Sequence, residues 1–213
     1  MRNNRSAPGP DGIDYRFIKM VLDARLRREL VTEVATSLMI PEEWQLSKVV
    51  LIPKPNKDHR AAKGWRPINL INCIGKLAEK VVADNLQEAG LFHKGQFGGI
   101  RGRSALEAMT RALTRAQRGL ARGGQVLWVM KDVKGGFNNV LGQEVLNAVA
   151  GSCRRSWSKW LAHFFRPQQF EVKWDGKVRG KGSCNVGVPQ GSPLIPGGVP
   201  YLDGTNIQKR RKE

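Results

Sequence analysis

The chain has 213 residues, and 40% of them are hydrophobic, which excludes disorder throughout and suffices for one large domain or two small ones. Its formal net charge is +18, more than solubility requires, so we expect a polyanionic partner, most simply nucleic acid. An anionic membrane surface is the competing partner, but Lys and Arg are spread along the chain rather than set in one amphipathic stripe.

Targeting signals and cysteine content limit the cellular compartments in which the protein is expected. The N-terminal stretch has no apolar core after its basic residues, which argues against a signal peptide, and no run approaches the length of a membrane span. The cysteines Cys73, Cys153 and Cys184 are widely spaced and suggest neither a disulfide framework nor a zinc site. We therefore expect an intracellular protein that is not secreted.

The first third of the chain predicts a long helix and a β-hairpin. Apolar residues recur at three- and four-residue steps over about 14–38, and Pro41 ends that helix. Strands are predicted at 49–52 and 68–71, joined by a loop that carries Lys54, Lys57 and Arg66. Such a loop suits the presentation of cations to phosphates, although a solvated surface hairpin explains this segment equally well.

Two helices are predicted next. The first covers about 75–89 and ends at Gly90. Ser104 and Glu107 form a capping-box pattern that opens the second, which extends to about Leu120. We expect Leu106, Met109, Leu113 and Leu120 to face inward. The opposite side carries arginines at helical spacing, namely Arg111, Arg115, Arg118 and Arg122, with Arg101 and Arg103 just ahead of it.

The stretch VLWVMKDVKGGFNNV from Val126 combines a predicted buried strand over 126–131 with a carboxylate at its end. A carboxylate in such a place is costly unless it is paired or holds a metal. Taken alone, Asp132 is better explained as a helix cap or a turn residue. The remaining chain decides whether it has a functional role.

The last part of the chain predicts two helices, a hairpin and a loop. The helices cover about 142–150 and 154–165, and the aromatic residues of the second are expected in the core. A strand pattern over 168–178 turns at Asp175-Gly176, a strong hairpin signal. The segment VGVPQGSPL then forms a loop over 186–194, and the basic tail is expected to fray.

Six motifs, taken in order, resemble the reverse transcriptase domain of non-LTR (LINE-type) retrotransposons, and the fungal members most closely. They are APGPDGI from Ala7, LIPKPNKDHRAAKGWRPINLIN from Leu51, GKLAEKVVADNL from Gly75, QFGGIRGRSALEAM from Gln96, DVKGGFNNV from Asp132 and GVPQGSPL from Gly187. No single motif suffices, but together they cover most of residues 7–194 in the right order, which makes the resemblance specific.

The resemblance implies an α+β fold, that of the fingers and part of the palm of a right-hand polymerase, with an incomplete palm sheet. Residues 1–125 would form a fingers-like region with an N-terminal helix, residues 126–200 a partial palm, and residues 201–213 a basic tail. The implied partners are an RNA template, a DNA primer and a dNTP, with no membrane. The resemblance also implies a nuclear or cytoplasmic place in the cell, and the oligomeric state is left open.

The resemblance also implies a catalytic site. Asp132 would be the first metal-binding aspartate, and the backbone carbonyl of Val133 would help to hold Mg²⁺. Two such ions would activate the primer 3′-hydroxyl and stabilise the leaving pyrophosphate. Further residues match nucleotide-binding positions: Arg66, Lys54, Lys57, Phe137 as a steric gate, Gln190 and Gly191. Independently of the family, we infer a nucleic-acid backbone track along Arg101, Arg103, Arg111, Arg115 and Arg118.

The family pattern is incomplete in this chain. Members carry two more aspartates in a Tyr/Phe-x-Asp-Asp hairpin beyond the PQGSP loop, whereas this chain continues IPGGVPYLDGTNIQKRRKE, with a single Asp203 too close to that loop. One carboxylate is not expected to hold two divalent ions stably. Gly136, Asn138 and Ile195 also replace the usual Ala, Asp and Ser. We therefore expect a C-terminally truncated reverse transcriptase fragment that is inactive as an isolated chain.

Three alternatives remain at the level of sequence. The first is a basic nucleic-acid-binding protein without catalysis. The second is a degenerate relict whose product barely folds. Within the enzyme class, a group II intron maturase is the second choice, because the QFGGIRGRSALEAM and GKLAEKVVA patterns favour the LINE-type family.

Overall fold

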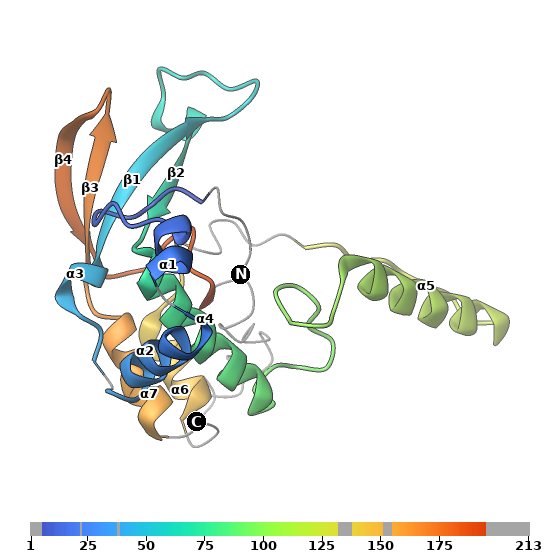
Figure 1. The fold of residues 1–213 in the computed structure, drawn as a ribbon. Coiled ribbons are helices and arrows are strands. Elements are labelled where there is room, and N and C mark those ends of the chain that lie inside the picture. Colours follow the sequence, from blue (N-terminus) through green and yellow to red (C-terminus); the bar gives the residue numbers. More distant parts are fainter. Residues whose placement is uncertain (1–5, 22, 38, 132–137, 151–154, 195–213) are drawn as a thin grey trace.

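A computed structural model describes residues 6–21, 23–37, 39–131, 138–150 and 155–194. Its described part combines α-helices with one four-stranded mixed sheet, which confirms the predicted α+β class. The sheet rises from a body of packed helices, and one helix, α5, stands away from that body (Figure 1). None of the helices in the described ranges has the length and hydropathy needed to cross a bilayer.

Two helices replace the single helix that the sequence predicts over 14–38. They are α1, Tyr15–Val21, and α2, Ala24–Thr36. The side chain of Asp23 accepts a hydrogen bond from the Leu26 amide at 2.7 Å and so begins a new helix, because an N-cap satisfies amides that have no partner within the helix. The prediction of one helix is wrong for this reason. Ile18 is buried as expected, but Val21 and Leu26 are exposed.

The sheet is built from two hairpins. After a short helix α3, Glu42–Gln45, strand β1, Leu46–Pro53, pairs antiparallel with β2, Trp65–Leu70. The second hairpin joins β3, Gln168–Trp174, to β4, Lys177–Cys184. Strand β3 runs parallel to β1, so the strand order is β2-β1-β3-β4. Both predicted hairpins are confirmed.

The second hairpin turns where the sequence predicts it. Asp175 has a φ of 49° and Gly176 a φ of 71°. Positive φ at both central residues matches the twist of the flanking strands, which is why Asp-Gly favours this turn.

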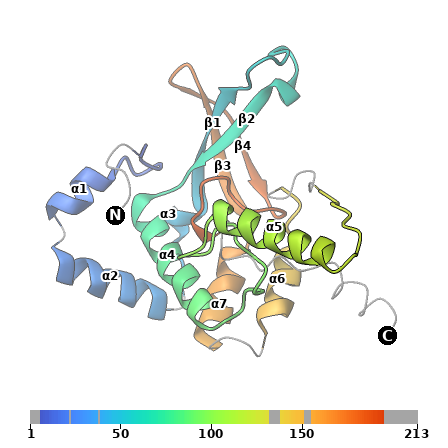
Figure 2. The same ribbon diagram turned by 90° about the vertical axis from the view of Figure 1, so that its right-hand side faces the viewer.

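The hydrophobic core lies between three helices below the sheet. These are α4, Cys73–Glu88, α6, Gly142–Val149, and α7, Arg155–Phe164. The rings of Trp160 and Phe164 stack with centroids 5.7 Å apart, and Val82, Leu86 and Val149 pack around them. The expected core role of the α7 aromatics is therefore confirmed. Figure 2 shows α4 and α7 lying beside one another below the strands.

Helix α5, Ala105–Ala121, begins as the capping pattern predicts, because the Glu107 amide donates to the Ser104 hydroxyl at 3.1 Å. The expected inward face is wrong. Leu106 is 74% exposed and Met109 is 64% exposed, and Leu113 and Leu120 are exposed as well. Helical spacing determines which residues share a face, but packing against another element decides whether that face is covered.

The strand predicted over residues 126–131 is also wrong. These residues have no strand assignment, and Leu127 and Met130 are 87% and 91% exposed. A strand forms only where a neighbouring strand satisfies its backbone hydrogen bonds, and in the described part of the chain no strand pairs with this segment. Residues 126–131 therefore have the composition of a strand but no partner strand among the described residues.

Candidate functional site

The loop that follows β4 is held between the sheet and the segment after residue 137. The backbone carbonyl of Gln190 accepts a hydrogen bond from the Asn69 amide of β2 at 3.1 Å. The Gly187 amide donates to the Val140 carbonyl at 2.9 Å. Two segments far apart in the sequence, residues 138–140 and residues 187–190, are thereby brought together at one end of the sheet.

Gly191 allows the loop to approach β2 closely. Its φ is +132°, and a Cβ placed there would lie 2.7 Å from the Asn69 carbonyl oxygen. A side chain at this position would meet both a strained backbone conformation and a steric clash. The glycine is therefore required for the contact between Gln190 and Asn69.

Ser192 fixes the far end of the loop. Its hydroxyl donates a hydrogen bond to the carboxyl group of Glu79 on α4 and accepts one from the Leu194 amide at 3.2 Å. Ser192 and Glu79 are both buried. Burial raises the pKa of Glu79 to about 7, against the lowering effects of the Ser192 hydrogen bond and of Lys76.

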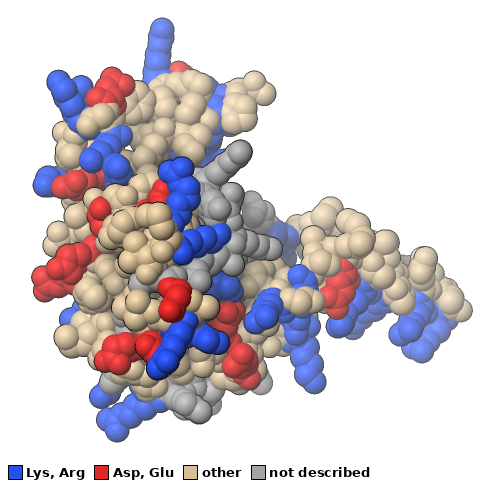
Figure 3. Space-filling model, viewed as in Figure 1, with Lys and Arg blue, Asp and Glu red and all other residues tan. Residues whose placement is uncertain are grey.

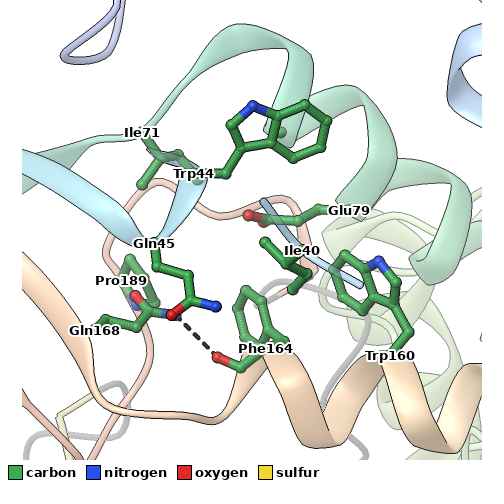
Figure 4. A pocket seen from close by; sticks show the side chains of 10 residues that line it. Ile40, Trp44, Gln45, Ile71, Glu79, Trp160, Phe164, Gln168 and Pro189 are labelled. Carbon is green, nitrogen blue, oxygen red and sulfur yellow. Dashed lines mark hydrogen bonds between the residues drawn. The ribbon is translucent and has the colours of Figure 1, made fainter. Parts of the chain in front are cut away.

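Sequence reasoning missed Glu79, although a signal was present. Glu79 lies on the same helical face as Gly75, Val82 and Leu86, all of which are buried. A carboxylate at an inward position of a helix is rarely left without a partner. Figure 4 shows the Glu79 side chain among Ile40, Trp44 and Trp160.

A cleft of about 360 Å³ opens beside the loop. Alternate residues of the strands line it, and such residues share one face of a sheet. They include Ser47, Val49, Pro67, Asn69, Phe170 and Val172. Asn138 and Gln190 also line the cleft, so it joins the loop to the residue that directly follows the predicted steric gate.

The predicted cations do not gather in this cleft. Arg66 on β2 is exposed. Pro67 and Asn69 line the cleft, and because neighbouring residues of a strand point to opposite faces, Arg66 lies on the face away from it. The Lys54 ammonium donates to the Lys63 carbonyl at 3.0 Å and so closes its own loop. Lys57 is exposed in that loop. Of the predicted nucleotide-binding side chains that the structure describes, only Gln190 lines the cleft.

Asp132, Val133 and Phe137 lie outside the described residues, so their predicted roles as metal ligands and steric gate stay predictions. Among the residues that the structure does describe, no three His, Cys, Asp or Glu side chains gather as a metal site would need. Asp132 is the one carboxylate of its segment, and a single carboxylate leaves most of the oxygen shell of Mg²⁺ unfilled.

Two of the predicted backbone-binding arginines have structural contacts. The Arg103 guanidinium donates to the carbonyls of His93 and Lys94, both at 3.1 Å, and to that of Gln96. The guanidinium groups of Arg103 and Arg111 lie 5.7 and 5.3 Å from the centroid of the Phe97 ring. Arg111 also pairs with Glu107 at 2.9 Å. Arg103 therefore shapes the loop before α5.

The remaining arginines of this predicted track are exposed to solvent. Arg101, Arg115 and Arg118 are exposed, the last two on the helix that stands away from the body. Lys and Arg side chains gather along one side of α5 in Figure 3, and the opposite side is largely uncharged. A polyanion would meet several cations at once on this side.

Comparison with known proteins places these features in a family context. Residues 52–197 match the family described as reverse transcriptase (RNA-dependent DNA polymerase). The chain is 24% identical over 201 residues to the probable RNA-directed DNA polymerase from transposon X-element of Drosophila melanogaster, which covers 92% of the chain and 22% of that protein.

Other relatives show the same pattern. The putative 115 kDa protein in type-1 retrotransposable element R1DM of Drosophila melanogaster is 27% identical over 197 residues, which is 89% of the chain and 18% of the relative. The RNA-directed DNA polymerase from mobile element jockey of the same species is 23% identical over 200 residues, 90% of the chain and 22% of the relative. The chain thus spans about a fifth of the length of these relatives. The closer likeness to fungal members stays a prediction.

Proposed function

The chain belongs to the reverse transcriptase family of RNA-dependent DNA polymerases, in the group found in non-LTR retrotransposons, and on this premise we propose that it supplies the nucleotide-facing part of such a polymerase. In this proposal residues 1–125 act as fingers and residues 126–200 as part of the palm. The partners are an RNA template, a DNA primer and a dNTP.

One observation supports the proposal most directly. The hydrogen bond between Gly187 and Val140 holds the loop of Gln190 beside the residues that follow Asp132 and Phe137. Asn138 and Gln190 then line one cleft. In the proposed site, Gln190 and Gly191 contact the nucleotide, Phe137 tests the sugar, and Asp132 supplies one carboxylate toward Mg²⁺.

The cations have separate roles in this proposal. Lys57 and Arg66 are exposed near the far end of the first hairpin and would attract phosphates, and Lys54 stabilises the loop that carries Lys57. Because Lys54 already donates to the Lys63 carbonyl, we propose that it acts on the nucleotide mainly through the shape of that loop.

Photoaffinity labelling with a photoreactive dNTP analogue tests the proposed site. We expect label on peptides that contain Asn138 and residues 185–190, and we expect excess unmodified dNTP to remove it. Gln190→Ala should weaken the labelling several-fold, whereas Gln117→Ala, an exposed glutamine on α5, should leave it unchanged. Label confined to other peptides, or label that dNTP does not displace, would exclude this cleft as the nucleotide site.

A second candidate function, nucleic-acid binding without catalysis, has its own supporting observation. Arg115 and Arg118 are exposed along one side of α5 and require no nucleotide site to bind phosphates. This function predicts salt-sensitive binding with little sequence preference. A labelled dNTP that binds the cleft would favour the polymerase proposal instead.

A further inference from the structure

Ser192 controls the position of the two residues before it. The Ser192 amide donates to the Pro189 carbonyl at 3.1 Å, so residues 189–192 form one tight turn. Gln190 and Gly191 are the central residues of this turn. Any shift of Ser192 is therefore transmitted to Gln190 through a turn that has little freedom to absorb it.

Glu79 provides a rigid anchor for that turn. It lies on α4 next to Ala78 and three residues before Val82, whose exposures are 1% and 0%. Close packing on both sides leaves α4 little room to move. The hydrogen bond from Ser192 to Glu79 thus ties the loop to a buried stretch of α4.

We propose that Glu79 is a positioning residue for the nucleotide-facing loop: through its hydrogen bond with Ser192 it holds Gln190 and Gly191 against β2. This inference rests on the proposed function, because holding Gln190 in position matters only if Gln190 contacts the nucleotide. It adds a residue on α4 that neither contacts the cleft nor belongs to the predicted site. The bond to Asn69 fixes the loop on one side, and the Glu79 contact fixes it on the other.

The surroundings of Glu79 suit a neutral hydrogen-bonding group more than a charge. Lys76 on the same helix lowers its pKa less than burial raises it, and Tyr15 on α1 is held neutral because burial raises its own pKa to about 12. A small pocket of about 20 Å³ adjoins the carboxyl group, lined partly by the uncharged side chains of Gln45 and Gln168 (Figure 4). This volume admits about one water molecule and no counter-ion of side-chain size.

Hydrogen exchange measured on the 213-residue chain tests the anchor directly. We expect Glu79→Ala and Ser192→Ala to reduce the protection of amides in residues 187–194 at least tenfold, with little change in the β1–β2 ladder. Glu79→Gln should retain most of the protection, because its amide oxygen can still accept from Ser192. The matched controls are Glu88→Ala, an exposed glutamate on the same helix, and Ser183→Ala, an exposed serine on β4.

A titration distinguishes the anchor from general destabilisation. In the native chain the amide chemical shifts of Ser192 and Leu194 should follow the ionisation of Glu79, with a midpoint near pH 7. In Glu79→Gln this transition should disappear while the loop stays protected. Unchanged titration in Glu79→Gln, or unchanged exchange in both Glu79→Ala and Ser192→Ala, would overturn the proposal. Glu79→Gln keeps the test valid even if the alanine variants fail to fold.

The anchor and the proposed function fail in different ways. If the loop loosens in Ser192→Ala and photolabelling by the dNTP analogue falls with it, both are supported. If the loop loosens and the native chain takes up no competable label, the Glu79–Ser192 contact stands as a structural anchor, but the positioning role is overturned together with the nucleotide site. If the native chain is labelled but the variants exchange like the native chain, only the anchor is overturned.

Discussion

The carboxyl group of Glu79 lies in an apolar interior where its charged form is disfavoured. Burial raises its pKa from 4.5 to about 7, because the loss of hydration outweighs the Ser192 hydrogen bond and the nearby charge of Lys76. Because the folded-state pKa is above the unfolded value, the native state binds more protons than the unfolded state between these pH values. The stability that this group contributes is full below pH 4.5 and is lost as pH rises to about 7.

Glu79→Gln should therefore change how stability depends on pH. Relative to the native chain, the variant should lack a decrease of about 3 kcal/mol in the free energy of unfolding between pH 4.5 and 7, measured by urea melts. The lowered pKa values of Asp14 and Glu171 act in the opposite sense but are common to both proteins. Parallel pH profiles for the native chain and the variant would contradict the buried state of Glu79.

Gly191→Ala tests the close approach of the loop to β2. The φ of +132° and the 2.7 Å distance to the Asn69 carbonyl oxygen should cost roughly 1–3 kcal/mol or displace the loop. Gly180→Ala on β4 is a suitable control, because a Cβ there meets nothing within 4 Å. Thermal melts of both variants, with hydrogen exchange of residues 187–194, check the prediction; equal melts and equal exchange would show that the contact is not formed.

Helix α5 carries basic side chains on one side and apolar side chains on the other. The arginines occupy one side and the leucines and methionine the other, and both sides are exposed. Arg103 and Arg111 hold the base of the helix through Phe97, which leaves Arg115 and Arg118 farther along it for an external partner. The helix therefore presents its cations along one side.

Arg115→Gln/Arg118→Gln should weaken binding to an RNA–DNA duplex and reduce its salt dependence. The slope of log K against log salt concentration should become less steep by about 2, because each phosphate neutralised contributes about 0.9. Fluorescence anisotropy between about 50 and 200 mM salt measures this slope. The control Arg155→Gln/Lys159→Gln removes two exposed cations from α7. Equal losses in both variants would indicate net charge alone rather than a track along α5.

The protein as a whole combines a high positive charge with a cleft at one face of the sheet. The net charge of +18 favours the binding of nucleic acid without fixing its orientation on the surface. The cleft between the sheet and the loop is the place where the proposed nucleotide would be held. Catalysis by this family also needs divalent metal, for which these 213 residues place one carboxylate, Asp132, in the matching motif.

A polypeptide of these 213 residues should bind template and primer without extending the primer. We expect no Mg²⁺-dependent product above background in a primer-extension assay, and no difference between the native chain and Asp132→Ala. The physical reason is that one carboxylate does not hold the metal ions against their hydration. Template-directed extension that Asp132→Ala abolishes would show that the residues present are sufficient.

The local elements were largely predictable. The sequence predicts a strand at 49–52, which lies within Leu46–Pro53, a turn at Asp175-Gly176 and a helix cap at Ser104, because turn, cap and strand preferences act over a few residues. Asp23 was missed because the apolar period ran through it unchanged, although its side chain offers the cap that divides the helix. The role of Glu79 is not predictable locally, because its helical spacing indicates a buried position but its partner Ser192 lies far away in the sequence.

The sequence by itself determined the family, the charge and most of the helices and hairpins, since these depend on motif order, composition and neighbouring residues. Only the tertiary structure decided that residues 126–131 lie unpaired, that the apolar side of α5 is exposed, and that Arg66 lies on the sheet face away from Gln190. It also joined Ser192 to Glu79, residues that are 113 positions apart. Pairing, burial and long-range contact require a partner from elsewhere in the fold, and no local pattern specifies that partner.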